Sequence, residues 1–165
     1  MNTHISNREI NQKEKLYQQI IDTFPQKSPP LVNEITYDDD ECCNRVKTEF
    51  NSLKWWSANC DFINRNYDVL SLFTSTAFHY YLPAFLICSL KRFEPDNRIL
   101  EYTIYSLSPT KTSQDDPWLK ERLRLFTPEQ INTIRNFLEY ILYDESMYAF
   151  HKDAERGIRK FWYER

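Results

Sequence analysis

Apolar residues recur every three or four positions along most of this chain. One segment that shows the rhythm clearly carries Ile131, Ile134, Phe137, Leu138, Ile141 and Leu142. This spacing places the side chains on one face of an α-helix. The strict alternation of apolar and polar residues that indicates a half-buried strand is not sustained over any convincing length. The pattern therefore predicts an all-α fold, a single-domain bundle of roughly six to eight helices.

Capping residues and prolines divide this predicted domain into three parts. Residues 6–24 are predicted to form an N-terminal helix, because Ser6 and Glu9 have the spacing of a capping box and an apolar periodic run follows them. Residues 25–33 contain three prolines, which cannot continue a helix, and are predicted to be a linker. Residues 36–163 are predicted to form the main bundle.

The most apolar helical pattern, "TSTAFHYYLPAFLICSL", contains Pro83 near its middle. A proline inside a helix loses its own hydrogen bond and presses on the carbonyl four residues back, here that of His79. Two separate helices would need Leu82 as a cap, and leucine caps poorly. We therefore expect one continuous helix kinked at Pro83, with His79 and Tyr80 away from its main buried face.

The overall charge limits the partners that can be expected. The chain has 165 residues with 21 basic and 24 acidic side chains, a formal net charge of −3. Nucleic-acid binding needs a basic field that this balance does not supply, so no nucleic-acid partner is expected. No apolar run reaches the roughly 20 residues that a membrane span requires, so no membrane partner is expected and the predicted location is cytoplasmic.

Cysteine and glycine usage argue against several chemistries. Cys42, Cys43, Cys60 and Cys88 contain no C-x-x-C pair, so we expect free structural thiols in a reducing compartment, with no metal and no cofactor. Gly157 is the single glycine, whereas phosphate-binding loops and hydrolase nucleophile turns depend on glycine. No catalytic residue is assigned and an enzyme is the less favoured class. Gly157 itself indicates close helix packing or fraying.

An acidic run, Asp38, Asp39, Asp40 and Glu41, precedes a helix expected over residues 38–53. Carboxylates stabilise the positive end of a helix dipole, which accounts for the run without any partner. The alternative is an anionic surface that binds a basic partner. The run lacks the spaced oxygen ligands and the turn glycine of a calcium loop.

Two adjacent tryptophans are further candidates for partner contact. Trp55 and Trp56 would point about 100° apart on a helix, which we expect over residues 55–67. One ring should therefore be buried and the other partly exposed, and exposed tryptophan is enriched at binding hot spots. The alternative interpretation is that both rings pack on the core and have no role in binding.

A second kind of site is conceivable at the predicted kink. The carbonyl freed by Pro83, the imidazole of His79 and the hydroxyls of Tyr80 and Tyr81 could hold a small polar ligand or act in acid–base chemistry. The alternative is that the rings pack and that water or a neighbouring side chain satisfies the carbonyl.

Three stretches, "LSLFTSTAFHYYLPAFLICSL", "RLRLFTPEQINTIRNFLEY" and "KFWY", resemble a family of small bacterial proteins recorded only as a domain of unknown function. The likeness covers roughly residues 55–162 and rests on the Tyr-Leu-Pro-Ala-aromatic element, Tyr81–Phe85, and on a capped helix with Thr127 and Gln130. It implies a stand-alone helical domain and no particular activity.

Three functional hypotheses follow. The leading one is a cytoplasmic protein-binding domain, such as an immunity or antitoxin-like inhibitor whose partner is a toxin or another basic effector. The second is a small-ligand sensor or enzyme that uses the kink near His79 and Pro83. The third is a structural subunit of a homo-oligomer that associates through its aromatic residues.

Overall fold

The computed structural model describes residues 7–91, 98–109 and 116–159. Its α-helices are α1 (Asn7–Thr23), α2 (Glu41–Phe50), α3 (Cys60–Arg65), α4 (Ser75–Lys91), α5 (Arg98–Leu107), α6 (Pro117–Leu123), α7 (Pro128–Tyr143) and α8 (His151–Gly157). Short 3-10 helices are η1 (Val32–Glu34), η2 (Trp55–Ser57), η3 (Val69–Ser71) and η4 (Glu145–Phe150). Within these described ranges, β pairing is limited to one isolated antiparallel bridge, Thr36 with Phe73. The predicted all-α bundle is confirmed.

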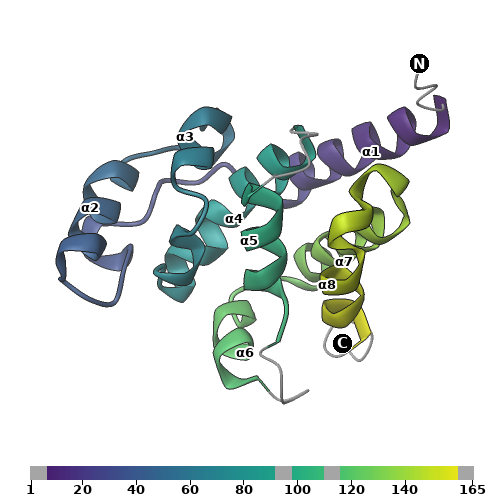
Figure 1. Ribbon diagram of the computed structural model, residues 1–165. Helices are drawn as coiled ribbons and strands as arrows, with labels where there is room; N and C mark the ends of the chain where they lie inside the picture. The colour runs from purple at the N-terminus through teal and green to yellow at the C-terminus, as the bar shows by residue number, and fades with distance from the viewer. Residues whose placement is uncertain (1–6, 92–97, 110–115, 160–165) are drawn as a thin grey trace.

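Helix α4 is the centre of the bundle. Fourteen of its 17 residues are buried, which is expected of a helix that is apolar on every side. It packs against α1, α3, α5, α6 and η2. Figure 1 shows α2 and α3 at one end of the molecule and α1, α7 and α8 at the other, with α4 and α5 between them. Most of the core therefore forms around a single segment of sequence.

Pro83 lies inside this helix without dividing it, so the predicted continuity of α4 is confirmed. Thr74 caps its start, because its hydroxyl accepts the backbone N–H of Ala77 at 3.1 Å. The expectation that Tyr80 lies away from the buried face was wrong, since its side chain is only 9 % exposed. With neighbours packed on several sides of α4, the helix has little outer face left for polar residues.

Two helix boundaries differ from the sequence-based expectation because polar side chains intervene. The helix expected over residues 38–53 begins later, at Glu41, since Asp40 is its N-cap. The helix expected over residues 55–67 is interrupted: η2 ends, and α3 starts anew after Asn59, whose side-chain oxygen accepts the N–H of Asp61 at 2.7 Å. An asparagine side chain that bonds nearby backbone competes with helix continuation.

The N-terminal helix packs on α7 and α4. Ser6 and the capping-box side chain of Glu9 lie outside the residues whose placement is described, as does the closing aromatic segment from Lys160 to Tyr163. The proline-rich segment lies against the bundle: the carbonyl of Pro25 accepts from Trp55 Nε1 at 3.3 Å and that of Lys27 from the Tyr80 hydroxyl at 3.1 Å.

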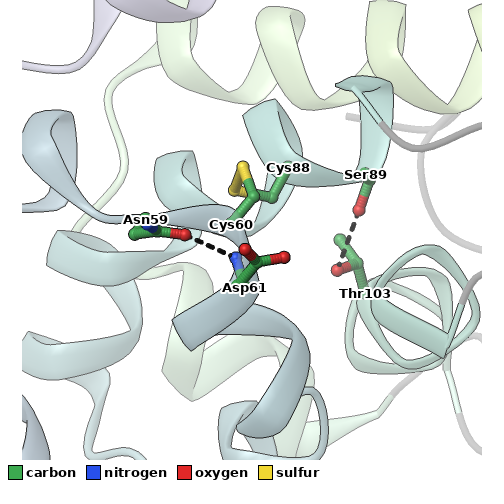
Figure 2. Close-up of a disulfide and its surroundings, with 6 residues drawn as sticks. All are labelled: Asn59, Cys60, Asp61, Cys88, Ser89 and Thr103. Carbon is green, nitrogen blue, oxygen red and sulfur yellow. Dashed lines mark hydrogen bonds between the residues drawn. A yellow bond between two sulfur atoms is a disulfide. The ribbon is translucent and has the colours of Figure 1, made fainter.

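The expectation of four free thiols was wrong, because Cys60 and Cys88 form a disulfide (Figure 2). The first residue of α3 lies beside the last turn of α4, with the two Cα atoms 5.3 Å apart although 28 positions separate them in sequence. That proximity depends on packing, so spacing gave no sign of it. Cys42 and Cys43 remain free, exposed and buried respectively.

Gly157 marks close packing, as one of the two interpretations predicted. A Cβ added there would lie 2.8 Å from the Ser108 hydroxyl, at the contact between α8 and the end of α5. Nothing larger than glycine fits unless Ser108 moves.

Across the described segments, the helices are all too short or too polar to cross a membrane.

Candidate functional site

The acidic run is built into the start of α2. Asp40 accepts the backbone N–H of Cys43 at 2.7 Å, and this bond lowers the pKa of the Asp40 carboxyl because it stabilises the charged form. Asp39 pairs with Lys47 one and a half turns into the helix. The Lys47 ammonium also donates to the carbonyl of Asp38 at 2.9 Å. Two of the four acidic side chains therefore serve the helix itself.

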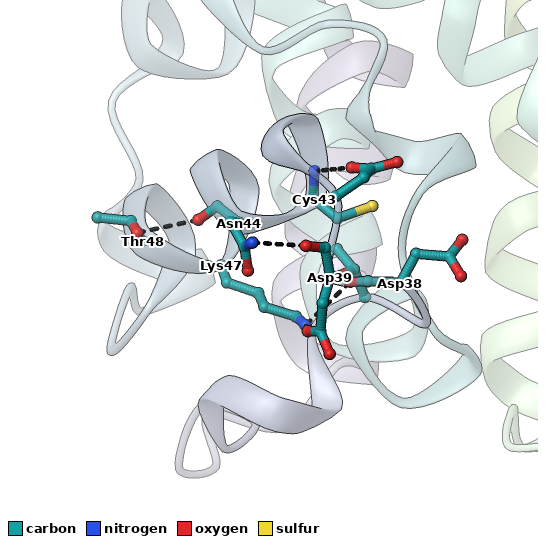
Figure 3. A network of polar contacts seen from close by, with 8 residues as sticks. Asp38, Asp39, Cys43, Asn44, Lys47 and Thr48 are labelled. Carbon is teal, nitrogen blue, oxygen red and sulfur yellow. Dashed lines mark hydrogen bonds and ion pairs between the residues drawn. The ribbon is translucent and has the colours of Figure 1, made fainter.

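The other two acidic side chains remain directed at solvent. Figure 3 shows the Asp38 carboxylate turned away from the contacts that surround Lys47. Asp38 and Glu41 are both exposed. The dipole interpretation thus accounts for part of the run, and an outward anionic surface remains at Asp38 and Glu41.

Large apolar side chains are exposed directly before this run. Leu31 is 67 % exposed, Val32 48 % and Tyr37 66 %. Together with the acidic residues they make residues 31–41 a mixed apolar and anionic segment, which we call the 31–41 surface. Leu31 and Val32 also line a shallow depression of about 450 Å³ with Pro29, Pro30, Asn33, Asn51 and Ser52.

The backbone of the 31–41 surface is held at several points. The Glu34 carboxylate accepts the N–H of Leu31 at 2.9 Å, and the carbonyl of Ile35 accepts the N–H of Thr74 at 3.0 Å. The Thr74 hydroxyl donates to the carbonyl of Glu34. The hydroxyl of Tyr37 lies 3.4 Å from the Ser75 hydroxyl and accepts the Ser75 N–H at 3.3 Å. The exposed side chains are therefore presented from a fixed backbone.

The tryptophan pair has the predicted division of exposure. Trp55 is 2 % exposed, whereas Trp56 is half-buried and meets it edge-on with ring centroids 5.8 Å apart. The ammonium of Lys54 lies 5.9 Å from the Trp56 ring, a cation–π distance. No contact in the described chain joins either ring to the acidic run, so these two predicted partner-binding groups are not brought into one site.

The residues of the predicted kink site have separate partners. Tyr80 donates to the carbonyl of Lys27, and the hydroxyl of buried Tyr81 donates to the carbonyl of Phe50 at 2.7 Å. Burial raises the pKa of both phenols. The cavity beside Leu31 and Val32 and the cavity between α1 and α7 are lined by other residues. Use of His79, Tyr80 and Tyr81 by a ligand stays a prediction.

The hydrogen bonds around His79 define which of its ring nitrogens carries a proton. Its Nε2 lies 2.9 Å from Gln130 Oε1, which also accepts the Thr127 N–H at 3.0 Å in the predicted capping box of α7. Because that backbone donor fixes Oε1 as an acceptor, His79 must donate from Nε2. Burial lowers the pKa of His79, and nearby Lys27 acts in the same direction against the Gln130 bond. The imidazole is therefore a positioned neutral donor.

Sequence reasoning missed Arg122, which is only 3 % exposed. Its guanidinium donates to the carbonyls of Leu70, Ser71 and Phe73, and lies 3.7 Å from the Trp118 ring. Burial lowers its pKa to about 10. Arg122 joins α6 to the turn before α4. Its position in a charged "KERLR" stretch offered no signal of burial.

Sequence reasoning also missed a polar seam between α1 and α7. Gln19 Nε2 donates to the Thr133 hydroxyl at 3.2 Å, and Asn136 Nδ2 donates to Gln19 Oε1 at 3.2 Å. The Thr133 hydroxyl also lies 3.2 Å from that of Thr23. The capping role of Gln130 was readable from the sequence, but these cross-helix contacts join residues more than 100 positions apart.

No group of three or more His, Cys, Asp or Glu side chains in the described ranges is arranged to hold a metal ion.

Residues 18–165 match the model of DUF6714, a family of unknown function. The chain belongs to this family. The matched range includes the proline-rich segment and the end of α1, and so extends further toward the N-terminus than the expected resemblance over residues 55–162. Neither the search of curated proteins nor that of solved structures returned a match.

Proposed function

We propose that this member of DUF6714 is a protein-binding domain that engages a basic partner protein through the 31–41 surface. The observation that carries the proposal is the exposure of Leu31, Val32 and Tyr37 within one short segment of fixed backbone. Clustered exposed apolar side chains on an otherwise polar surface are typical of interaction sites.

The fixed backbone favours binding because little ordering is needed when the partner arrives. The contacts from Ile35 to Thr74 and from Leu31 to Glu34 hold the segment before any complex forms. Loop ordering is among the main costs of association, so a preformed segment retains more of its contact energy. Tyrosine adds a large and rather rigid contact area at low entropy cost.

The outward carboxylates of Asp38 and Glu41 indicate the charge of the partner. Complementary charge at the rim of an apolar patch increases the association rate and disfavours partners of like charge. A basic surface therefore fits this site best. The specific form that we propose is an immunity or antitoxin-like inhibitor, in which the 31–41 surface covers a basic cleft of a toxin.

Affinity capture with matched variants tests this proposal. The tagged chain is compared with L31S/Y37S, which removes apolar contact, and with D38N/E41Q, which removes charge but spares the cap Asp40 and the paired Asp39. Leu125 and Tyr148, 39 % and 77 % exposed elsewhere, supply the control L125S/Y148S.

We expect a basic protein that is captured by the wild type and the control, lost with L31S/Y37S, and bound more weakly and with less salt dependence by D38N/E41Q. The purified pair should then reproduce these differences. Identical capture profiles for all four proteins would contradict the proposal.

A further inference from the structure

A cavity of about 300 Å³ lies between α1 and α7, at the far end of the polar seam from His79. Helix α1 lines it with Lys15, Leu16 and Gln19, α7 lines it with Asn136 and Glu139, and Asp144 follows directly after α7. The volume is at the lower end of the range for small-molecule sites. Such a site suits a ligand about the size of an amino acid or a short peptide end.

The two helices run antiparallel along this cavity, and this sets which charges oppose each other. Gln19 contacts Asn136, whereas the later α1 residue Thr23 contacts the earlier α7 residue Thr133. Lys15 lies one turn before Gln19, about 6 Å along the axis, and Glu139 lies nearly one turn beyond Asn136, about 4.5 Å. Lys15 and Glu139 therefore lie at about the same height along the helix axes, on opposite walls of the cavity.

These two charges form no ion pair with each other. Both residues nevertheless line the same cavity. Asp144, on the same side as Glu139, acts on Lys13 and raises the pKa of that ammonium against the larger lowering by burial. Lys15 and Glu139 are therefore the oppositely charged pair that faces across the cavity.

Polar and apolar groups complete the cavity between the two charges. The amides of Gln19 and Asn136 are half-buried and oriented by their mutual bond and by Thr133. Leu16, 5 % exposed, gives an apolar patch beside them. Oriented amides with a small apolar surface are the features that fix a polar ligand in a pocket.

We propose that this cavity binds an amino-acid-like zwitterion, with its carboxylate on Lys15 and its ammonium on Glu139. Because the two charges line one cavity without pairing, a molecule whose own charges are several atoms apart can reach both, such as an ω-amino acid or the two ends of a dipeptide. This site is independent of the 31–41 surface, and either proposal can fail without the other.

The test uses 6-aminohexanoate as the probe, with hexanoate and hexylamine as counterparts that each carry one of its two charges. Binding to the full chain is measured by isothermal titration calorimetry and by amide shifts in ¹⁵N NMR spectra. We expect 6-aminohexanoate to shift resonances of residues 12–19 and 136–144, and each single-charge counterpart to bind at least tenfold more weakly.

Charge reversal gives the sharper test. K15E and E139K should each weaken binding at least tenfold, because one end of the zwitterion then meets a like charge. The double variant K15E/E139K should recover an affinity within about threefold of the wild type, since the ligand can bind in the opposite orientation. R124E, at the C-cap of α6, is the control, and the circular dichroism and thermal midpoint of every variant establish that it is folded.

The proposal is overturned if 6-aminohexanoate at 10 mM shifts no resonance of these segments. It is equally overturned if hexanoate or hexylamine binds as tightly as the zwitterion, or if the double variant binds no better than the single ones.

Discussion

The disulfide between Cys60 and Cys88 should contribute a large part of the stability of this domain. Its two cysteines are 28 positions apart. In the chain-entropy treatment, closing a loop of this length removes enough unfolded-state entropy to stabilise the fold by about 3.6 kcal/mol at 25 °C. For a chain of this size, each kcal/mol changes the melting temperature by about 2–4 °C, so reduction should lower it by roughly 7–14 °C.

Chemical denaturation of oxidised and reduced protein measures this effect. We expect the reduced wild type to unfold at a lower urea concentration, and C60A/C88A to do so whether or not reductant is present. The slope of the free energy of unfolding against urea should also be larger without the cross-link, because the unfolded chain then exposes more surface. C42S is the control, since Cys42 is exposed and free.

Thiol counting decides whether the premise holds. Unfolding the oxidised chain should expose two thiols, those of Cys42 and Cys43, and reduction should raise the count to four. Equal denaturation midpoints for the oxidised and reduced wild type would refute the loop-closure argument. Four thiols in the non-reduced protein would refute the disulfide itself.

Three further predictions concern single positions. G157A should destabilise the protein, because its new methyl group meets the Ser108 hydroxyl. In an S108A background the same substitution should stabilise the protein by up to about 1 kcal/mol, because alanine has the higher helix propensity. Thermal unfolding of the wild type, G157A, S108A and the double variant checks this. The pKa of His79 is lowered in the folded state, so as pH falls the unfolded state binds the proton at a higher pH than the folded state does. The stability that neutral His79 provides should therefore be lost as pH falls below the ordinary pKa of 6.5. H79Q should therefore lose less stability than the wild type between pH 7 and pH 5 in urea titrations, and equal losses would contradict the assignment. R122A should lower the free energy of unfolding by about 3 kcal/mol or more, because three backbone carbonyls each lose a hydrogen bond worth about 1 kcal/mol. R124A, on the exposed side of the same segment, should change the urea midpoint little.

Many of the helices could be predicted from the sequence, because the interactions that start and continue a helix are local. A cap acts on backbone groups within one turn, so Thr127 with Gln130 fixed the start of α7 correctly. The same locality explains why Pro83 within an apolar run indicated one continuous helix, since Leu82 was a poor place to start another. Apolar spacing then sufficed for the fold class, because helices with one apolar face have few ways to bury it.

Sequence by itself determined the helical class, the cap of α7 and the division of exposure between Trp55 and Trp56, whereas at Gly157 it left close packing and fraying as alternatives. The tertiary structure alone decided which distant groups meet: the disulfide, the carbonyls around Arg122, and the facing charges of Lys15 and Glu139. The reason is physical. A helix repeats every 3.6 residues and reveals its own faces, whereas the choice of partner for each face depends on how all the helices pack together.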